Sequence, residues 1–475
     1  MIFNFKLLLC YNNIFEINVG MKKDDLLSIS PLDGRYSEIC KDIGNIFSEY
    51  SLIKYRVLIE IKWFIYLSKL NKISGLPKIT TKDEKFLNNI FLNFNIKDAK
   101  IVKNFEKTTK HDVKATEYFL KSKFDKSSQL KKFKEYIHIC CTSEDINNLS
   151  YALMITDGRN VILNKIDDIK KILKKYTKKF SKCIMLSYTH GQPATPTTMG
   201  KEFLNFYHRI DKLSHKLKNI KIEGKFNGAT GNYSAHKVTF PNVNWPIANK
   251  KFINSLGIDE NKYTTQIEPH DYICEISNIL SHINAIFIGH SQDMWAYISK
   301  NYFIQKNIAN EIGSSTMPHK INPINFENAE GNLGLANSML RFLSNKLSIS
   351  RLQRDLSDST VLRNLGVGFG YSFLAYENLS VGLNKLTINK TKLDEDLENS
   401  WELLAEPIQM VSRKYNISNS YELLKKVTRG KKVTRDILHN LINSLKIPKI
   451  EKNKLLSLTP KKYIGYAIDL CNDKR

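Results

Sequence analysis

Residues 273–287, ICEISNILSHINAIF, carry the pattern that decides the fold. Apolar side chains recur in alternating steps of three and four residues, a spacing that places them on one side of an α-helix. This stripe consists of Ile273, Ile276, Leu280, Ile283 and Phe287. Three further segments have the same spacing: Ile162, Ile166, Ile169, Leu173, Tyr176 and Phe180; Phe203, Phe206, Ile210, Leu213, Leu217 and Ile220; and Leu333, Ala336, Leu340, Leu343 and Leu347.

Stripes of this kind in successive segments predict long helices that pack at shallow angles, because a bundle keeps such stripes in contact along their length. The sequence therefore predicts an all-α protein. We expect three helical domains: short helices and loops over residues 21–130, a central long-helix bundle over 131–385, and short helices again over 386–475. A hairpin-like stretch is expected between Gly224 and Tyr233, where Gly and Asn cluster.

The chain has 475 residues and 42% hydrophobic content, which is enough to fill a large core. Its net charge of +25 points first to an anionic partner such as nucleic acid. However, no aromatic-plus-Arg stripe accompanies the charge, and Lys far outnumbers Arg. A basic surface set by composition is therefore favoured over a nucleic-acid-binding face, and small polyanionic substrates fit both interpretations.

Cysteine use and hydropathy indicate the compartment. The seven Cys are odd in number and contain no CxxC, which favours reduced thiols in a cytosol. No apolar run reaches the roughly 18 residues needed to span a bilayer. We expect a cytoplasmic protein without membrane contact. Residues 1–20 lack the basic start and cleavage site of a signal peptide, and Met21 begins a more ordinary N-terminus. The first twenty residues are therefore expected to be a non-native extension from a misread start codon.

The segment 313–323, GSSTMPHKINP, has the composition of an active-site loop. It holds two Ser, a Thr, a His, a Lys and an Asn, which are too polar for a core, and two Pro that restrict the backbone. A Ser-Ser-Thr cluster that merely caps a helix is the alternative.

This segment resembles the signature loop of the fumarase/aspartase superfamily, whose members eliminate fumarate from substituted succinates. Within it, six more segments are similar to the adenylosuccinate lyase family. They are SPLDGRYS (30–37), EKTTKHDVKA (106–115), CTSEDINNLS (141–150), THGQPATPTTMGKE (189–202), TTQIEPHDY (264–272) and RDLSDSTVLRNLG (354–366). The resemblance runs from about Ser28 to Arg475, and several collinear motifs that agree are far more specific than one.

The resemblance implies a β-elimination that releases fumarate from adenylosuccinate to give AMP, and from the succinylated aminoimidazole carboxamide nucleotide of de novo purine biosynthesis. It implies that Ser314 is the general base and that His190 is the general acid, which protonates the leaving nitrogen. A serine hydroxyl is a very weak acid, so backbone N–H groups and the Lys320 ammonium must favour its alkoxide. The alternative is that Ser314 only donates hydrogen bonds and that Ser315 or a His is the base.

The same resemblance implies the residues that bind the substrate. Those for the nucleotide and its phosphate are Arg35, Tyr36, Arg354, Ser359 and Arg363; those for the succinyl carboxylates are Thr142, Ser143, Lys320 and Asn322; further contacts are His111, Asp112 and Gln266. Glu327 is expected to pair with a site histidine or to be an ordinary acid at a helix N-terminus. His138, His270 and His319 are expected to make supporting hydrogen bonds.

No His-Glu-x-x-His spacing, glycine-rich phosphate loop or Rossmann fingerprint occurs, so neither a metal nor a nucleotide cofactor is expected. The resemblance implies a homotetramer in which each active site takes residues from three subunits. The heptad stripes are consistent with that assembly without establishing it.

Two other functions stay open. A sister enzyme such as an argininosuccinate lyase would use the same loop on another leaving group, although His319 and the TSED and QIEPHD segments favour the purine enzyme. A non-catalytic structural or nucleic-acid-binding protein could keep the fold, but the presence of Ser314, His190 and Lys320 argues against it.

Overall fold

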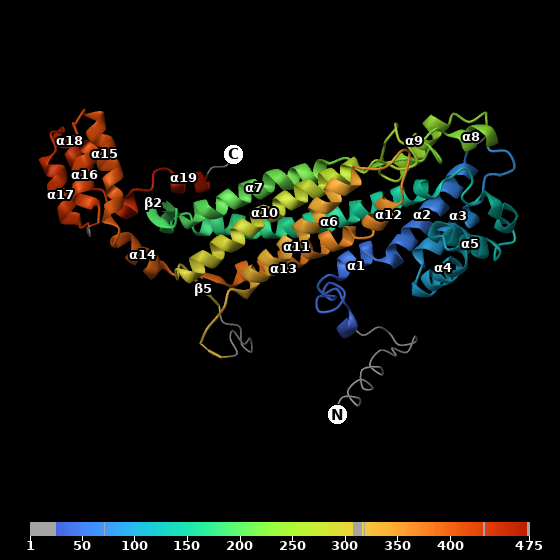
Figure 1. The fold of residues 1–475 in the computed structure, drawn as a ribbon, viewed down its shortest axis with the longest axis horizontal. Helices are drawn as coiled ribbons and strands as arrows, with labels where there is room; N and C mark the ends of the chain where they lie inside the picture. Colours follow the sequence, from blue (N-terminus) through green and yellow to red (C-terminus); the bar gives the residue numbers. More distant parts are fainter. Residues whose placement is uncertain (1–24, 71, 307–315, 318, 431–432, 473–475) are drawn as a thin grey trace, which may run out of the picture.

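The structure is a computed structural model that describes residues 25–70, 72–306, 316–317, 319–430 and 433–472. The proposed extension over residues 1–20 lies outside them. The molecule is elongated, with long helices in the middle and shorter helices at both ends (Figure 1). Helices predominate, as the stripes predicted.

The central bundle contains five long helices: α6 (Ser143–Lys179), α7 (Met199–Asn219), α10 (Asp271–Ser299), α11 (Ile324–Leu347) and α13 (Leu365–Lys385). α6 packs against α7 and α13, and α11 packs against α10 and α13 (Figure 1). Every residue of the four predicted stripes is buried in this bundle. The prediction of a long-helix bundle is therefore confirmed.

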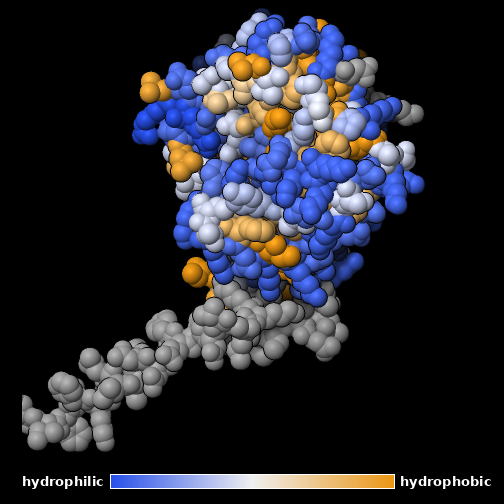
Figure 2. All heavy atoms as spheres, turned by 90° about the vertical axis from the view of Figure 1, so that its right-hand side faces the viewer, coloured by the Kyte–Doolittle hydropathy of each residue, from blue (hydrophilic) through white to orange (hydrophobic). Residues whose placement is uncertain are grey.

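Shorter elements cover one end of the bundle. They are the 3-10 helices η1 (Asp25–Leu27) and η2 (Leu130–Tyr136) and the helices α1 (Lys41–Phe47), α2 (Glu49–Ser68), α3 (Thr81–Leu92), α4 (Ile96–Thr109), α5 (Asp112–Phe124), α8 (Ser234–Thr239) and α9 (Trp245–Ser255). Trp63 of α2 joins two parts of this end, since its ring centroid lies 4.4 Å from that of Phe226 and 6.2 Å from that of Trp245. The surface here is mainly hydrophilic, with hydrophobic residues in small patches (Figure 2).

The other end begins where β5 (Phe303–Gln305) pairs antiparallel with β6 (Leu386–Ile388). Beyond it lie α14 (Lys390–Glu398), η3 (Trp401–Leu404), α15 (Ala405–Lys414), α16 (Ser420–Thr428), α17 (Arg435–Ser444), α18 (Lys449–Leu456), η4 (Pro460–Lys462) and α19 (Ala467–Asn472). Trp401, Ile408 and Leu438 belong to a second hydrophobic cluster, separate from the main core. The domain boundaries expected near residues 130 and 385 stay predictions. The separate hydrophobic cluster is our reason for proposing the boundary near residue 385.

The hairpin lies elsewhere than predicted. β1 (Ile184–Thr189) and β2 (Gln192–Thr198) form an antiparallel pair, whereas β3 (Glu223–Gly224) pairs in parallel with β4 (Asp259–Glu260). The prediction of a hairpin between Gly224 and Tyr233 was wrong. In that loop the backbone N–H groups of Asn227 and Gly228 donate to the side chain of Asp145 rather than to a returning strand. Among the described residues, no helix is long and apolar enough to cross a membrane.

Candidate active site

The N-terminal ends of α5 and α6 bring three predicted site residues together. His111 is the N-cap of α5, and its Nδ1 accepts a hydrogen bond from the backbone N–H of Lys114 at 3.2 Å. In the neutral ring the proton therefore lies on Nε2, which is 3.4 Å from Oγ of Ser143. Thr142 is the N-cap of α6. The N-termini of α5 and α6 thus lie side by side, and they present polar side chains together with the positive ends of two helix dipoles.

Asp112 lies between two guanidinium groups. Its Oδ2 accepts hydrogen bonds at 2.8 Å from both Arg56 and Arg363. Burial alone would raise the pKa of Asp112, but Arg56, the backbone N–H of Val113 and Arg363 together lower it below its usual value. The carboxylate is therefore ionised near neutrality and fixes both cations. Arg363 also pairs with Glu49 at 2.5 Å, and its side chain is 37% exposed, so a phosphate can reach it.

A chain of hydrogen bonds continues from Arg56 to Gln266. Nε of Arg56 donates to Asn147 at 2.8 Å, and Asn147 donates to Glu144 at 2.8 Å. Arg354 then donates to Glu144 at 3.0 Å and to Gln266 at 3.1 Å. We call this connected group the arginine network; its members are Arg363, Asp112, Arg56, Asn147, Glu144, Arg354 and Gln266. It joins four residues that the sequence predicted for the site, which are Asp112, Gln266, Arg354 and Arg363.

Sequence reasoning missed three members of this network. Glu144 and Asn147 lie inside the CTSEDINNLS motif, so the motif itself was the signal that could have found them. Arg56 had no such signal, because it lies outside the motifs in α2, a helix with many apolar residues. Its side chain is only 1% exposed, and a buried guanidinium with carboxylate and amide partners is a positioning group.

Arg35, Tyr36 and Glu327 make other contacts than the hydrogen bonds of the arginine network. Oη of Tyr36 accepts a hydrogen bond from Asn328 of α11 at 3.4 Å, and the exposed guanidinium of Arg35 lies 5.6 Å from the Tyr36 ring. Glu327 accepts from the indole N–H of Trp295 at 3.1 Å. Within this chain Glu327 lies in the first turn of α11, as the alternative of an acid at a helix N-terminus expected, and its pairing with a histidine stays a prediction.

The signature loop is only partly described, and Ser314 lies outside the described residues. Lys320 and His319 are exposed, and Asn322 is half-buried. Gln305 of β5 donates to the carbonyl of Ile321 at 3.1 Å, which holds this segment at the start of α11. Ser359 is half-buried in the first turn of α12 (Ser357–Leu362), where its N–H donates to Asp358 at 2.6 Å.

His190 is at the tip of the β1–β2 hairpin. Thr189 pairs with Gln192, which leaves a two-residue turn of His190 and Gly191, with φ of 53° and 74°. Positive φ at both central residues is what a type I′ hairpin turn requires. The exposed imidazole thus projects from the end of a two-stranded hairpin. This position would suit a group that contacts another surface.

The long helix α6 separates His190 from the arginine network. It has 37 residues, so Ser143 at its start lies about 54 Å from its C-terminal end. The hairpin is anchored at that far end, because Gly200 N–H donates to the carbonyl of Phe180 at 3.0 Å (Figure 1). A seven-residue strand spans only about 24 Å. His190 and Ser143 of one chain therefore cannot contact the same small molecule.

Two of the supporting histidines lie beside carboxylates, with His138 half-buried and His270 buried. His138 Nδ1 lies 2.6 Å from Glu60, which raises the pKa of His138 although burial opposes the charge. Nε2 of His270 lies 3.4 Å from Asp358, and Nδ1 lies 3.6 Å from Glu268. Burial again opposes the charge, but hydrogen bonds to Asp358 and Glu268 raise the pKa of His270 to about 9. His270 thereby ties the 264–272 motif to α12.

The raised pKa of His270 predicts a loss of stability at alkaline pH. Its contribution is fully present below its ordinary pKa of 6.5 and is lost as the pH rises through about 9. At about 1.4 kcal/mol per pKa unit, the loss amounts to a few kcal/mol. Thermal unfolding across this range should show the gap in stability between the unaltered protein and His270→Gln narrowing with pH. A gap that stays constant would contradict the charged state of His270.

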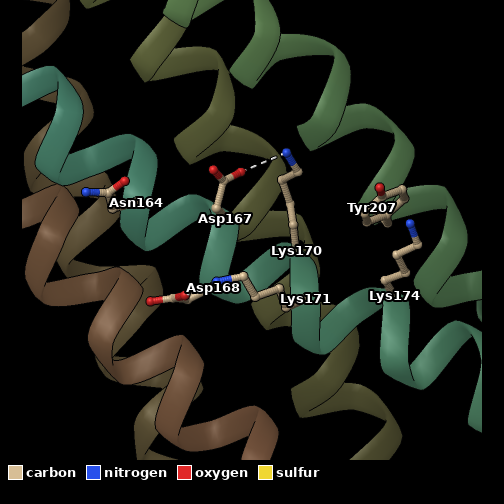
Figure 3. A pocket seen from close by; sticks show the side chains of 7 residues that line it. All are labelled: Asn164, Asp167, Asp168, Lys170, Lys171, Lys174 and Tyr207. Carbon is tan, nitrogen blue, oxygen red and sulfur yellow. Dashed lines mark hydrogen bonds and ion pairs between the residues drawn. The ribbon is translucent and has the colours of Figure 1, made fainter.

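A surface cleft of about 450 Å³ lies far from these residues, along the middle of α6 (Figure 3). Asn164, Asp167, Asp168, Lys170, Lys171, Lys174 and Tyr207 line it. Two of its lysines are paired locally, with Lys170 at 2.9 Å from Asp167 and Lys171 at 2.9 Å from Asp168. None of the predicted site residues lines this cleft, so its size alone does not make it the active site. Over the described ranges, no group of three His, Cys, Asp or Glu could hold a metal ion.

Comparisons with known proteins agree over most of the chain. Residues 34–336 match the lyase family model, and residues 350–464 match the model of the adenylosuccinate lyase C-terminal region. An adenylosuccinate lyase from Buchnera aphidicola subsp. Schizaphis graminum is 54% identical, with 95% of this chain and 100% of the relative covered. One from Escherichia coli K12 is 47% identical, with the same coverage. A fumarate lyase structure from Mesorhizobium sp. BNC1 has a TM-score of 0.72 at 15% identity, covering 91% of this chain and 96% of that one, which shows the likeness in fold.

Proposed function

Because the chain belongs to the adenylosuccinate lyase family and acts as a lyase of that kind, we propose that it releases fumarate from adenylosuccinate with His190 as acid and Ser314 as base. The base removes the proton from the carbon beside a succinyl carboxylate. The electron pair forms the new C=C bond, and the C–N bond to the purine breaks. The acid protonates the departing nitrogen, so the products are AMP and fumarate.

The placement of His190 supports its role as the acid. An exposed imidazole at the tip of a turn, with no helix stripe to fill, is available to a substrate. Imidazole is a side chain that can give up a proton and regain it in each cycle. Ser314 lies in the same motif as Lys320, whose ammonium would stabilise the alkoxide and the charge that develops on the carboxylate.

The arginine network supports the binding of the substrate's anions. Arg354 is held by Glu144, and Arg363 by Asp112 and Glu49. Both retain guanidinium N–H groups for a phosphate, which planar guanidinium groups bind well. Thr142 and Ser143 at the start of α6 suit a succinyl carboxylate, since hydroxyl donors and the helix dipole both favour an anion there. We assign Lys320 and Asn322 to the same carboxylates, Arg35, Tyr36 and Ser359 to the nucleotide, and His111, Asp112 and Gln266 to further contacts.

The separation of His190 from the arginine network is the observation behind our proposal of a shared site. Both groups are needed for one substrate, yet in one chain they lie toward opposite ends of α6, which is about 54 Å long. They can meet only if another copy supplies one of them. A closed assembly of four copies, with each site built from several chains, satisfies this requirement.

Two finer points belong to the same proposal. The succinylated aminoimidazole carboxamide nucleotide also carries a phosphate and a succinyl group bonded to nitrogen, so we infer that the site also cleaves it. We place the enzyme in the cytoplasm, with small purine nucleotides rather than nucleic acid or membrane as its partners. The free state of the six described cysteines suits a reducing compartment.

A fumarate assay tests the proposal directly. The purified protein is mixed separately with adenylosuccinate, the carboxamide nucleotide and argininosuccinate, and fumarate is measured. We expect release from the first two and none above background from the third. Release from argininosuccinate alone would overturn the purine assignment. Tight, salt-sensitive DNA binding without any fumarate release would revive a nucleic-acid-binding role.

A further inference from the structure

A buried ion pair lies directly behind the start of α6. Nζ of Lys225 is 2.9 Å from Oδ1 of Asp145, and both side chains are completely buried. Neither residue can contact a substrate in this position. Removing two charges from water costs several kcal/mol per ion before their attraction and hydrogen bonds offset it, so well-packed apolar residues would often be as stable. A buried pair of this kind is therefore better explained by what it positions than by stability.

Asp145 collects hydrogen bonds from two separate segments. Its carboxylate accepts from the backbone N–H of Thr142 at 2.8 Å, which closes the first turn of α6. It also accepts from Asn227 N–H at 3.1 Å and from Gly228 N–H at 3.2 Å. Gly228 has a φ of +84°, a conformation that favours glycine and lets the two consecutive N–H groups converge on one carboxylate.

Lys225 completes the junction from the other side. Its ammonium donates to the carbonyl of Gly228 at 2.8 Å as well as to Asp145. Its backbone N–H donates to Asn148 at 2.8 Å, and its carbonyl accepts from Asn148 at 3.0 Å. The 225–228 loop is thus bound to the first two turns of α6 through side chain and backbone together.

The same loop continues to a residue of the arginine network. The carbonyl of Ala229 accepts from the side-chain N–H of Gln266 at 3.1 Å, and Gln266 also accepts from Arg354. Asn227 donates to Thr264 at 2.8 Å, two residues before Gln266. A shift of the loop relative to α6 would therefore move Gln266 and Arg354 relative to Thr142 and Ser143.

We propose that Asp145 and Lys225 are positioning residues that set Thr142 and Ser143 at the start of α6 in register with Gln266 and Arg354. The inference rests on the proposed assignment of Thr142 and Ser143 to the succinyl carboxylates. The carboxylate end and the phosphate end of the substrate are then held at a fixed separation by a junction that neither end touches.

The test separates positioning from stability by comparing Lys225→Met with the double variant Asp145→Asn/Lys225→Met. The single variant leaves Asp145 buried without its cation, whereas the double variant removes both charges. The amide that replaces the Asp145 carboxylate has only one acceptor oxygen for the converging backbone N–H groups, so the junction stays disrupted although no net charge is buried. Lys165→Met is the control, because Lys165 pairs with Glu377 and lies on the same helix as Asp145, about 30 Å away.

We expect the double variant to regain much of the melting temperature lost in Lys225→Met while kcat/KM for adenylosuccinate stays about 100-fold below the unaltered enzyme. Lys165→Met should keep its kcat/KM. Recovery of kcat/KM together with the melting temperature would overturn the inference, since the pair would then act through stability alone.

A Ser143→Ala variant in the same assay distinguishes this inference from the proposed function. A raised KM in Ser143→Ala supports the assignment of the start of α6 to the substrate. An unchanged KM there would mean that the assignment fails. Amide hydrogen exchange in 142–146 and 225–229 gives a readout without substrate, and it should quicken in both Lys225 variants but not in Lys165→Met. Unchanged exchange would also contradict the positioning role.

Discussion

Replacing His190 with glutamine is expected to lower kcat for adenylosuccinate by about 10²- to 10⁴-fold, the usual contribution of a positioned general acid. The reason is chemical: glutamine can donate a hydrogen bond to the leaving nitrogen but cannot transfer a proton to it. The fold should persist, because the imidazole is exposed at the tip of a two-residue turn. Single-turnover fumarate release measures the loss of rate, and circular dichroism measures whether the helix content is retained.

His215→Gln is the matched control, since His215 is an exposed histidine on α7 whose side chain is 68% exposed. It should be as active as the unaltered enzyme. Ser314→Ala is expected to lose activity to a similar extent as His190→Gln, because no group then removes the carbon-bound proton. Full activity in either site variant would show that the acid and base roles are assigned to the wrong side chains, even though the family is right.

The bundle could be predicted because its signal is periodic. A residue such as Leu280 or Leu340 must be buried if its helix packs along one stripe, and both are completely buried. The β1–β2 hairpin could not be predicted in the same way. Pro193 and Pro196 lack backbone N–H groups and argue against a strand, and a bulge between Met185 and Ser187 interrupts the alternation. Both features made local propensity point to a loop, although the two strands pair in the structure.

The site was only partly predictable, for a different reason. Motifs supply residue types and order, and these predicted Asp112, Arg354 and Arg363, which the structure joins in one network. They supply no distances, so the gap between His190 and Ser143 along α6 became visible only in three dimensions. Arg56 was missed because charged side chains are rarely buried, and nothing in the sequence of this helix indicates that Arg56 is an exception. Its partners Asp112 and Asn147 come from segments 56 and 91 residues away.

Mixing two inactive variants should restore activity if the site is shared. His190→Gln removes the acid from the β1–β2 turn, and Arg363→Ala removes a cation at the end of α12; β2 and α12 lie toward opposite ends of the bundle (Figure 1). In a randomly mixed assembly, an intact site takes His190 from a chain that carries Arg363→Ala. It takes Arg363 from a chain that carries His190→Gln. About one site in four then carries both intact groups, so mixed assemblies should recover roughly a quarter of full activity.

The experiment requires subunit exchange, which can be reached by expressing two differently tagged variants together and purifying through both tags. Each parent variant, purified alone, sets the background. A control assembly of His190→Gln with Ser314→Ala shows whether the base comes from the acid's own chain or from another. If every mixture of His190→Gln and Arg363→Ala stays at the parental level, His190 and Arg363 of different chains do not act on one substrate. Because the length of α6 keeps the two groups of one chain apart, His190 would then have to act outside the site that binds the phosphate.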